Sequence, residues 1–362
     1  MKILYVATVS NTINAFLIPH IKFLIEKGHQ VDIACSINQE LKDELKNLDV
    51  EVFNIPFSRK PYNLSNLKAY KSLKKVISEN GYDIIHSHTP VASFICRLIT
   101  RKSQSIKRIY TAHGFHFYKG APLLNWLIYY PIEKYLSKYT DVLITINKED
   151  YERASKNMKA KKTVLINGVG IEPNGYTNQV SPRNLRTEYN LDKDNYLIFS
   201  IGELNKNKNH KVVIRALSTL KNPKIYYMIA GEGSQRFKLE KMIRKLKLQS
   251  NVILLGYVER ASELLRDVDL FIMPSKREGL PVSLLEAVSK NVFSVGSNIR
   301  GIKDILVDQE LLFNPSNHFS TGQFIKNKFE FPNKNKYNAI DIKKYSLENV
   351  LEDLAKRVYK FV

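Results

Sequence analysis

The sequence predicts an α/β protein made of two Rossmann-like domains, in each of which helices flank a parallel sheet. Short apolar runs alternate with longer amphipathic stretches along most of the 362 residues, and this alternation is typical of parallel sheets covered on both faces. The length exceeds the usual size of one domain. A polar stretch with little periodicity, from Gly168 to about Asp194, interrupts the alternation once and is typical of a linker.

We therefore expect an N-terminal domain over residues 1–175 and a C-terminal domain over residues 176–345. Ser346 is a suitable N-cap, so residues 346–362 should form a last helix that completes the first domain. In this fold class ligands bind at the C-terminal ends of the strands. An inter-domain cleft between those ends is the expected site.

In the first domain, apolar runs predict strands and amphipathic stretches predict helices, of which Gly28 and Gly81 end two. The predicted strands are Ile3–Thr8, Val31–Cys35, Val50–Ile55, Ile84–His88, Arg108–His113, Val142–Asn147 and Val164–Asn167. The predicted helices are Ala15–Glu26, Gln39–Leu48, Leu64–Asn80, Val91–Thr100 and Leu123–Leu136.

The second domain repeats the pattern up to residue 306. The predicted strands are Tyr196–Ile201, Ile225–Ala230, Val252–Leu255, Leu270–Pro274 and Phe293–Ser297. The predicted helices are Val212–Leu220, Phe237–Leu246, Ser262–Arg266, Pro281–Ser289 and Ile302–Leu306. Residues 315–338 are polar and rich in Lys and Asn, and they predict no element.

The composition predicts a cytoplasmic protein that meets anionic partners. Cys35 and Cys96 are too few for a disulfide framework, and the first apolar run is too short for a signal peptide. A net charge of +21 suits a nucleic acid, an anionic lipid surface or a phosphorylated substrate. No helix-turn-helix, zinc-finger or RNA-recognition signature accompanies the charge, so nucleic acid is not an expected partner.

The run Leu123–Ile132 is too short to span a bilayer, which needs about 20 residues. It holds or adjoins aromatic and basic residues that suit a membrane surface: Trp126, Tyr129, Tyr130, Lys119, Lys134 and Lys138. The alternative is a core helix with its tyrosines hydrogen-bonded inside, and the sequence leaves both open.

The loop before the helix Pro281–Ser289 is suited to bind phosphate. The proline fits the first helical position, because its φ is fixed and no N–H donor is needed there. The main-chain amides of Val282 and Ser283 would then point out of a helix N-terminus, where anions bind. Glu278 and Glu286 flank this place, although two surface carboxylates are an equally simple explanation.

The loop Gly202–His210 carries Lys206 and Lys208 ahead of the next helix. Both lysines would face the same edge of the sheet as the helix amides, which predicts a clamp for a diphosphate. The alternative is a solvated Lys/Asn turn. Glycines that follow strands, such as Gly256, let a ligand approach the main chain, so Gly256, Tyr257 and Val258 suit contacts to a nucleotide base.

No dinucleotide or metal cofactor is expected. The first strand-to-helix loop, Thr8–Phe16, contains no glycine, and Gly231-x-Gly233 lacks the third glycine of a dinucleotide fingerprint. His86, His88, His113 and His116 gather at the ends of two strands, where a zinc site has to be considered. Cysteine and carboxylate companions are missing nearby. Structural histidines, with one or two facing an anionic or hydroxylated substrate, are the expectation.

Taken together, these motifs resemble the retaining glycosyltransferases of family 4, which have the GT-B fold, over nearly the whole chain. The matching elements are Tyr82–His88, Thr111–Gly114, the G-x-L-x-x-x-K loop Gly202–Lys208, Ala230–Gly233, Asn251–Gly256 and the E-x7-E motif Glu278–Glu286. The resemblance is greatest to transferases of bacterial capsule and exopolysaccharide assembly, which share the glycine-poor first loop and the Thr-Ala-His-Gly-Phe-His segment.

The resemblance implies roles for matching residues. Glu286 would hold the ribose hydroxyls, Glu278 the hydroxyls of the donor sugar, and Lys208 with the Val282 and Ser283 amides the diphosphate. His113 would lie beside the anomeric carbon. The remaining donor-side residues would be Lys206, Gly202, Gly256, Tyr257, Val258, Gly279 and Leu280, and the acceptor-side residues Asn14, Phe16, His88 and His116.

The resemblance also implies a reaction and partners. A hexose or N-acetylhexosamine would pass, without metal and with retained configuration, from a nucleotide-sugar (a UDP-sugar first of all) to a lipid-diphosphate-linked saccharide. The enzyme would sit peripherally on the anionic inner face of the cell membrane. One departure stands out, because Glu203 occupies a position where many relatives have an arginine. A sugar-nucleotide epimerase of the same fold and a basic polyanion-binding protein are the alternatives.

Overall fold

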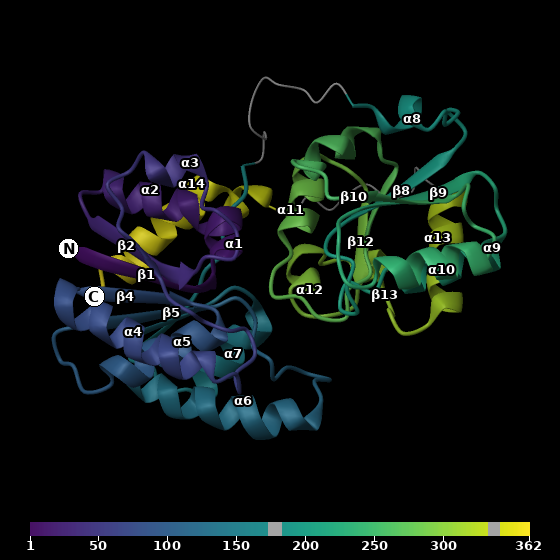
Figure 1. The fold of residues 1–362 in the computed structure, drawn as a ribbon. Coiled ribbons are helices and arrows are strands. Elements are labelled where there is room, and N and C mark those ends of the chain that lie inside the picture. Colours follow the sequence, from purple (N-terminus) through teal and green to yellow (C-terminus); the bar gives the residue numbers. More distant parts are fainter. Residues whose placement is uncertain (173–182, 332–340) are drawn as a thin grey trace. The chain divides into compact units, whose positions relative to one another are not determined.

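The computed structural model describes residues 1–172, 183–331 and 341–362, which fold into two compact units (Figure 1). The first unit comprises Met1–Val169 with Glu348–Val362, and the second comprises Gly170–Leu347. Each unit contains one parallel sheet with helices packed against it, so the predicted fold class is confirmed. The domain boundary predicted between residues 175 and 176 lies outside the described residues.

The sheet of the first unit has the order β3-β2-β1-β4-β5-β6-β7, and all its strands are parallel. The strands are β1 Lys2–Val9, β2 Gln30–Ser36, β3 Val52–Asn54, β4 Ile84–His88, β5 Lys107–Ala112, β6 Val142–Thr145 and β7 Lys162–Leu165. The order reverses between β1 and β4. In open α/β sheets such a switch point opens a crevice at the C-terminal strand ends, where ligands bind.

The helices of the first unit cover both faces of this sheet. They are α1 Ser10–Thr12, the π-helix η1 Ile13–Leu17, α2 Ile18–Glu26, α3 Asp43–Lys46, α4 Ser65–Asn80, α5 Pro90–Thr100, α6 Leu123–Leu136, the 3-10 turn η2 Ser137–Tyr139 and α7 Lys148–Asn157. The last helix, α14 Leu347–Leu354, continues as the π-helix η7 Ala355–Tyr359. Val350, Leu354 and Val358 join the core formed with α2, so the C-terminus packs on the first sheet.

The sheet of the second unit has the order β10-β9-β8-β11-β12-β13, with its switch point between β8 and β11. The strands are β8 Tyr196–Ile201, β9 Ile225–Ala230, β10 Val252–Gly256, β11 Leu270–Met273, β12 Ser294–Ser297 and β13 Leu312–Phe313. The helices are α8 Leu185–Glu188, α9 Lys211–Leu220, α10 Arg236–Lys245, η3 Ala261–Asp267, α11 Val282–Ser289, α12 Ile302–Ile305, η4 Gln309–Leu311, α13 His318–Glu330 and η6 Ile342–Tyr345.

Several predicted elements differ from the structure. The helix expected over Gln39–Leu48 shortens to α3, and the one expected from Ala15 begins earlier, as α1 and the π-helix η1. Pro281 is the N-cap of α11 rather than its first residue, since its ψ of 113° is extended. α7, β13 and α13 were not predicted at all. No helix among the described residues is long and apolar enough to cross a membrane.

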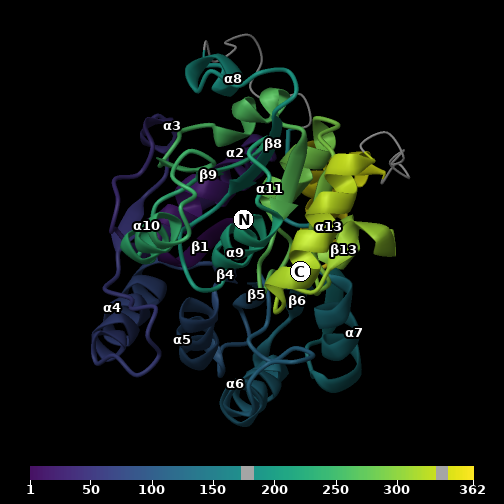
Figure 2. The same ribbon diagram turned by 90° about the vertical axis from the view of Figure 1, so that its right-hand side faces the viewer.

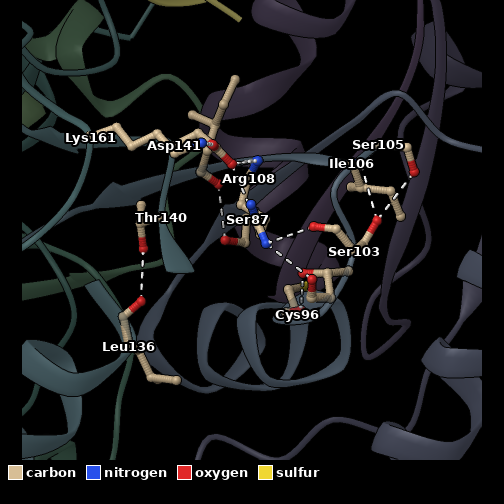
Figure 3. A network of polar contacts seen from close by, with 12 residues as sticks. Ser87, Cys96, Ser103, Ser105, Ile106, Arg108, Leu136, Thr140, Asp141 and Lys161 are labelled. Atoms are coloured by element: carbon tan, nitrogen blue, oxygen red, sulfur yellow. Dashed lines mark hydrogen bonds and ion pairs between the residues drawn. The ribbon is translucent and has the colours of Figure 1, made fainter. Parts of the chain in front are cut away.

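A polar network holds the edge of the first sheet at which the strands begin, opposite the edge at which they end (Figure 3). Asp141, just before β6, accepts from the main chain of Arg108 at 2.9 Å and pairs with its guanidinium at 3.0 Å. Lys161 approaches the same carboxylate at 2.7 Å. Burial alone would raise the pKa of Asp141, but these cationic partners outweigh burial and lower it. Arg108 also donates to the carbonyls of Thr100 and Ser103, which ties α5 to the sheet.

Candidate functional site

The loops at the switch point of the second unit bring predicted site residues together. β8 and β11 are neighbours in the sheet, so the loop after β8 (residues 202–210) and the loop after β11 (residues 274–281) lie side by side. Main-chain and side-chain bonds join them: Lys276 N donates to Asn207 O at 2.8 Å, and Asn207 Nδ2 donates to Arg277 O at 2.8 Å. The two loops therefore form one surface.

Lys208 and Glu278 form an ion pair at the centre of this surface. Lys208 Nζ lies 2.8 Å from Glu278 Oε1, and both side chains are mostly buried. The aliphatic part of Lys208 lies over Gly202, where an added Cβ would come within 3.1 Å of Lys208 Cε. Gly202 thus leaves room for the lysine stem. The sequence predicts that Lys208 and Glu278 each contact a different part of the sugar donor. In the structure the two side chains pair with each other.

The N-terminus of α11 opens onto the same surface. Leu284 and Leu285 donate to the Pro281 carbonyl at 3.2 Å each, so the amides of Val282 and Ser283 precede the helical bonds. These two amides have no partner among the described residues, and the helix dipole adds partial positive charge there. Ser283 Oγ lies 3.4 Å from the carbonyl of Ile201, directly before Gly202. The structure therefore brings the helix amides, Gly202 and Lys208 to one surface.

Asparagine side chains hold the lysine loop in shape. Asn205 Oδ1 accepts from the amides of Asn207 and Lys208, at 2.9 and 2.8 Å. Asn209 takes a positive φ of 57°, and its amide group donates to the carbonyls of Pro274 and Pro315. Their roles were not predicted, although an Asn that accepts from amides two and three residues on is a recognisable turn pattern.

Gly301 supports the loop that carries Glu278. It has a φ of +74°, and a Cβ on it would lie 2.2 Å from the carbonyl oxygen of Gly279. Only glycine allows the Glu278–Gly279 main chain to approach so closely. The sequence motif gave no sign of this contact, because Gly301 lies outside the motif.

We expect Gly301→Ala to displace the Glu278 loop and to lower the free energy of unfolding by roughly 2–4 kcal/mol, the sum of backbone strain and the clash. Gly28→Ala is the matched control, since Gly28 has a φ of +81° but nothing within 4 Å of the added Cβ. Urea unfolding should show a loss near 1 kcal/mol for the control. Equal losses in both variants would mean that the contact with Gly279 is unimportant.

Glycines also let the loop after β9 pack against the loop after β8. A Cβ on Gly231 would lie 2.0 Å from Gly202 O, and one on Gly233 would lie 2.6 Å from Leu204 O. Gly231 in turn donates to Gly256 O at 2.7 Å. The glycines thus bring the end of β10 to the edge of the site. There Tyr257 is 78% exposed, so its ring is open to a ligand.

His210 lies beneath the lysine loop in a buried chain of hydrogen bonds. Ser200 Oγ donates to Ile272 O at 2.6 Å, so the single Ser200 proton is used and the Tyr227 hydroxyl donates to Ser200. His210 Nδ1 must then donate to Tyr227 at 2.9 Å. Burial, and next the charge of Lys208, lower the pKa of His210 to about 3. A neutral His210 therefore links β8, β9 and β11 under the site.

Lys206 and Glu203 lie apart from the Lys208–Glu278 pair. Both side chains are exposed, and Glu203 forms no ion pair with any described lysine. Lys206 lies near Lys211, whose pKa is lowered by burial and then by the charges of Lys276, Arg215 and Lys206. The loop thus carries one paired lysine and one exposed lysine in a cationic neighbourhood.

Glu286 lies one turn into α11, and its side chain is half-buried. Burial raises its pKa to about 7, an effect that the charge of Lys290 opposes. A carboxyl with such a pKa changes its protonation state near neutral pH, which is common at functional sites.

The switch point of the first unit carries a cluster of three histidines, of which His86 and His88 are buried and His113 is half-buried. His88 Nδ1 lies 3.1 Å from His113 Nε2, and the rings of His86 and His88 stack with centroids 4.3 Å apart. His86 bonds to Tyr359 from the C-terminal helix at 2.6 Å and to Thr111 at 2.8 Å. His88 Nε2 is buried without a partner among the described residues. The contact between His88 Nδ1 and His113 Nε2 orients the His113 ring.

The clustered histidines are neutral at physiological pH. Burial, and next the charge of His20, lower the pKa of His113 to about 4. Burial likewise places the pKa values of His86 and His88 well below the usual range. Among residues 1–172, 183–331 and 341–362, no group of three or more His, Cys, Asp or Glu side chains is arranged to hold a metal ion.

Thr89, next to His88, has a main-chain conformation rare for a β-branched residue, with φ 71° and ψ 146°. Its hydroxyl bonds to the amide of Thr8 at 3.2 Å and to the Thr8 hydroxyl at 2.6 Å. These bonds join the ends of β1 and β4 across the switch point. Strain of this kind persists where the surroundings determine the conformation, often at functional sites.

The predicted acceptor-side residues are held in different ways. Asn14 joins η1 to the segment before α3, since Nδ2 donates to Glu40 O at 2.8 Å and Oδ1 accepts from Lys42 N at 3.1 Å. Phe16 is partly exposed on η1. The ring of His116 stacks on Tyr129 of α6, with centroids 4.8 Å apart. Within this group, His88 contacts His113.

Comparison with known proteins matches both units. Residues 2–147 match the family described as glycosyl transferase 4-like, and residues 182–337 match glycosyl transferases group 1. The putative glycosyltransferase EpsD of Bacillus subtilis is 38% identical over 316 residues, 85% of this chain and 82% of the relative. A UDP-Gal:alpha-D-GlcNAc-diphosphoundecaprenol alpha-1,3-galactosyltransferase of Escherichia coli is 26% identical over 77% of this chain and 74% of the relative.

Solved structures agree on the fold. The structure of Anabaena HepE in complex with UDP and glucose superposes with a TM-score of 0.79 at 17% sequence identity, covering 99% of this chain and 100% of that one. A glycosyltransferase from Rickettsia africae superposes with a TM-score of 0.78 at 20% identity, covering 99% and 98%. At these identities the likeness concerns the architecture.

Proposed function

Because the chain belongs to the group 1 glycosyltransferases, with a family 4-like N-terminal half and the GT-B fold, we propose a specific reaction for it. It transfers a hexosyl or N-acetylhexosaminyl group from a nucleotide-sugar, with UDP as the nucleotide, to a lipid-diphosphate-linked saccharide. The configuration at the anomeric carbon is retained. The product serves the assembly of a bacterial capsule or exopolysaccharide.

The observation that carries the proposal is the convergence of Lys208, Gly202 and the N-terminus of α11 at one switch point. A diphosphate needs fixed positive groups, and here a lysine and two free amides face the same surface. Donors fixed before the reaction stabilise the charge that develops on the leaving diphosphate. These groups provide that charge stabilisation without a metal ion.

Lys208 and Glu278 are each other's partners in the structure, at 2.8 Å. On donor binding, the diphosphate would take over Lys208, and Glu278 would turn its oxygens to hydroxyls of the sugar. Each charged group would thus exchange one partner for another, which limits the cost of leaving either unpaired. Glu286 would accept hydrogen bonds from the ribose hydroxyls.

In the transfer step, the acceptor oxygen attacks the anomeric carbon on the face from which the phosphate leaves. The bond from carbon to the phosphate oxygen breaks, and the acceptor proton passes to that oxygen. His113 is neutral and is oriented by His88. It would form a hydrogen bond beside the donor sugar while positive charge develops on the sugar ring. No enzyme carboxylate has to form a covalent intermediate.

Relatives support the choice of substrates. The HepE structure contains UDP and glucose, and the name of the E. coli relative states a UDP-galactose donor and a diphosphoundecaprenol-linked acceptor. A lipid-linked acceptor places the enzyme at the cytoplasmic face of the cell membrane. The test is turnover of a panel of UDP- and GDP-sugars with a diphosphoundecaprenol-linked N-acetylhexosamine, with NMR of the product to assign the anomer. An inverted product, or conversion of the donor without acceptor, would contradict the proposal.

Donor affinity should depend on pH through Glu286. The ribose hydroxyls donate to a carboxylate, so binding needs the deprotonated form, and the pKa of Glu286 is raised to about 7. Below that pKa, affinity for a UDP-sugar should fall by up to about tenfold per pH unit. A UDP-sugar is the right probe, because its diphosphate does not ionise in this range.

Glu286→Gln is the control for this titration, since it should bind weakly at every pH. Because the folded protein favours protonated Glu286, its carboxylate destabilises the fold as pH rises from about 4.5 towards 7. The variant should therefore gain thermal stability at alkaline pH relative to the wild type. A wild-type affinity that stays constant between about pH 6 and 8 would exclude Glu286 as the titrating contact.

A further inference from the structure

Helix α6 turns an apolar face to the outside of the first unit. Figures 1 and 2 show the helix on the outer side of that unit, away from β1. Six large apolar side chains on it are between 38% and 73% exposed: Leu123, Leu124, Leu127, Ile128, Ile132 and Tyr135. Their spacing of three and four residues places most of them on one side of the helix. A continuous exposed apolar stripe of this kind marks an interaction surface.

Three of the four aromatic residues of α6 face inward instead, and Tyr135 is the exception. Trp126, Tyr129 and Tyr130 pack against the core that contains Phe115 and Phe117. From the sequence, Trp126, Tyr129 and Tyr130 suited either a membrane surface or a core helix. In the structure these three side chains belong to the core side. The exposed side is formed by their aliphatic neighbours together with Tyr135.

A buried ion pair fixes which side of α6 faces out. Glu133, the only acidic residue of the helix, lies 2.8 Å from Arg97 of α5, and both side chains are almost fully buried. The Arg97 guanidinium lies over the Tyr110 ring at 4.4 Å. Turning the apolar side inward would expose the pair and leave Trp126 without its core contacts. The helix is therefore held with its aliphatic side outward, although both of its sides are apolar.

The charge around the stripe is cationic. With Glu133 buried, the exposed charged residues of α6 and η2 are Lys134 and Lys138, and Lys138 lies over the Tyr135 ring at 5.6 Å. Arg101 lies close enough to Tyr139 to act on it electrostatically. Aliphatic side chains bordered by lysines and an arginine complement a bilayer, in which acyl chains lie beneath anionic headgroups.

We propose that this face of α6 is the surface by which the protein binds a membrane containing anionic lipids. The helix lies in the plane of the interface, with Leu124, Leu127 and Ile128 among the acyl chains and Lys134 and Lys138 at the phosphates. A second copy would offer Lys134 and Lys138 no exposed carboxylate from α6, because Glu133 is buried against Arg97, and this disfavours a second copy as the occupant. This surface would bring the enzyme to a lipid-linked acceptor. That use of the surface rests on the proposed function, whereas membrane binding itself does not.

The test is sedimentation of the purified full chain with vesicles of phosphatidylcholine, with and without phosphatidylglycerol. The wild type should partition onto anionic vesicles, and less so as salt is added. The double variant Leu124→Ser/Leu127→Ser should bind at least about tenfold more weakly. Lys134→Gln/Lys138→Gln should abolish the preference for phosphatidylglycerol. Phe237→Ser/Phe319→Ser, which replaces equally exposed side chains in the second unit, is the matched control and should bind as the wild type does.

Two results would overturn the proposal: wild-type partitioning by the Leu124/Leu127 variant, or a dimer in solution that this variant dissociates while vesicle binding is absent. UDP binding, measured on the same samples by thermal shift, separates this proposal from the proposed function. Loss of vesicle binding with unchanged UDP binding concerns the α6 surface alone. Absence of UDP binding with intact vesicle binding concerns the enzyme's activity alone.

Discussion

Replacing Lys208 with alanine is expected to lower turnover of a UDP-sugar by roughly 100- to 1000-fold. The lysine would lose two functions at once: it would no longer neutralise the leaving diphosphate, and Glu278, its partner at 2.8 Å, would be left partly buried without a counter-ion. Because the diphosphate is present in the bound donor as well as in the transition state, both KM and kcat should change.

Lys206→Ala is the matched control, because Lys206 lies in the same loop but is exposed and apart from Glu278. It should cost no more than a few-fold. Measuring kcat and KM for both variants decides between them. A larger loss for Lys206→Ala would transfer the phosphate role to that residue and would make the Lys208–Glu278 pair a structural feature.

Replacing His113 with alanine is expected to lower kcat by about 100-fold while leaving UDP affinity unchanged. His113 belongs to the first unit, whereas the loops proposed to bind the nucleotide all belong to the second. Its effect should therefore appear in the chemical step rather than in nucleotide binding. Since its pKa is lowered to about 4, the neutral ring acts at all physiological pH values, and kcat should show no titration of this group above about pH 5.

His29→Ala serves as the control, since His29 lies at the other end of the first unit beside the N-terminus. His88→Ala should lower kcat to an intermediate degree, because it removes the 3.1 Å bond that orients His113 without removing the ring itself. If His113→Ala weakened UDP binding as much as it lowered kcat, the histidine would have to act through the fold of the protein.

The strands could be predicted because parallel strands buried on both faces are almost continuous apolar runs. Ile225–Ala230 and Tyr196–Ile201 were predicted with the bounds that the structure has. Helix α13 could not be predicted, since its buried side holds Thr321, Gly322, Ile325 and Lys328, of which only Ile325 is aliphatic. Gly322 lets it approach α9, where an added Cβ would lie 3.1 Å from Thr219 Oγ1. A helix that packs closely through small residues shows no regular spacing of apolar residues in its sequence.

The sequence indicated which residues belong to the candidate site, but not which of them pair with each other. The lysine loop and the two glutamates follow from motifs, whereas the contact between Lys208 and Glu278 spans 70 residues and depends on β8 and β11 being neighbours. The support of the Glu278 loop by Gly301 likewise appears only in three dimensions. Local sequence therefore indicated the candidate binding groups, and sheet topology determined how they meet.

Calorimetric titration of UDP into the wild type and into Lys208→Ala measures the proposed diphosphate site itself, which Lys208 and the N-terminus of α11 would form. We expect the wild type to bind one UDP and the variant to bind at least about tenfold more weakly, a loss of about 1.4 kcal/mol or more. Equal affinities in the two proteins, or no binding of UDP by the wild type, would contradict the account.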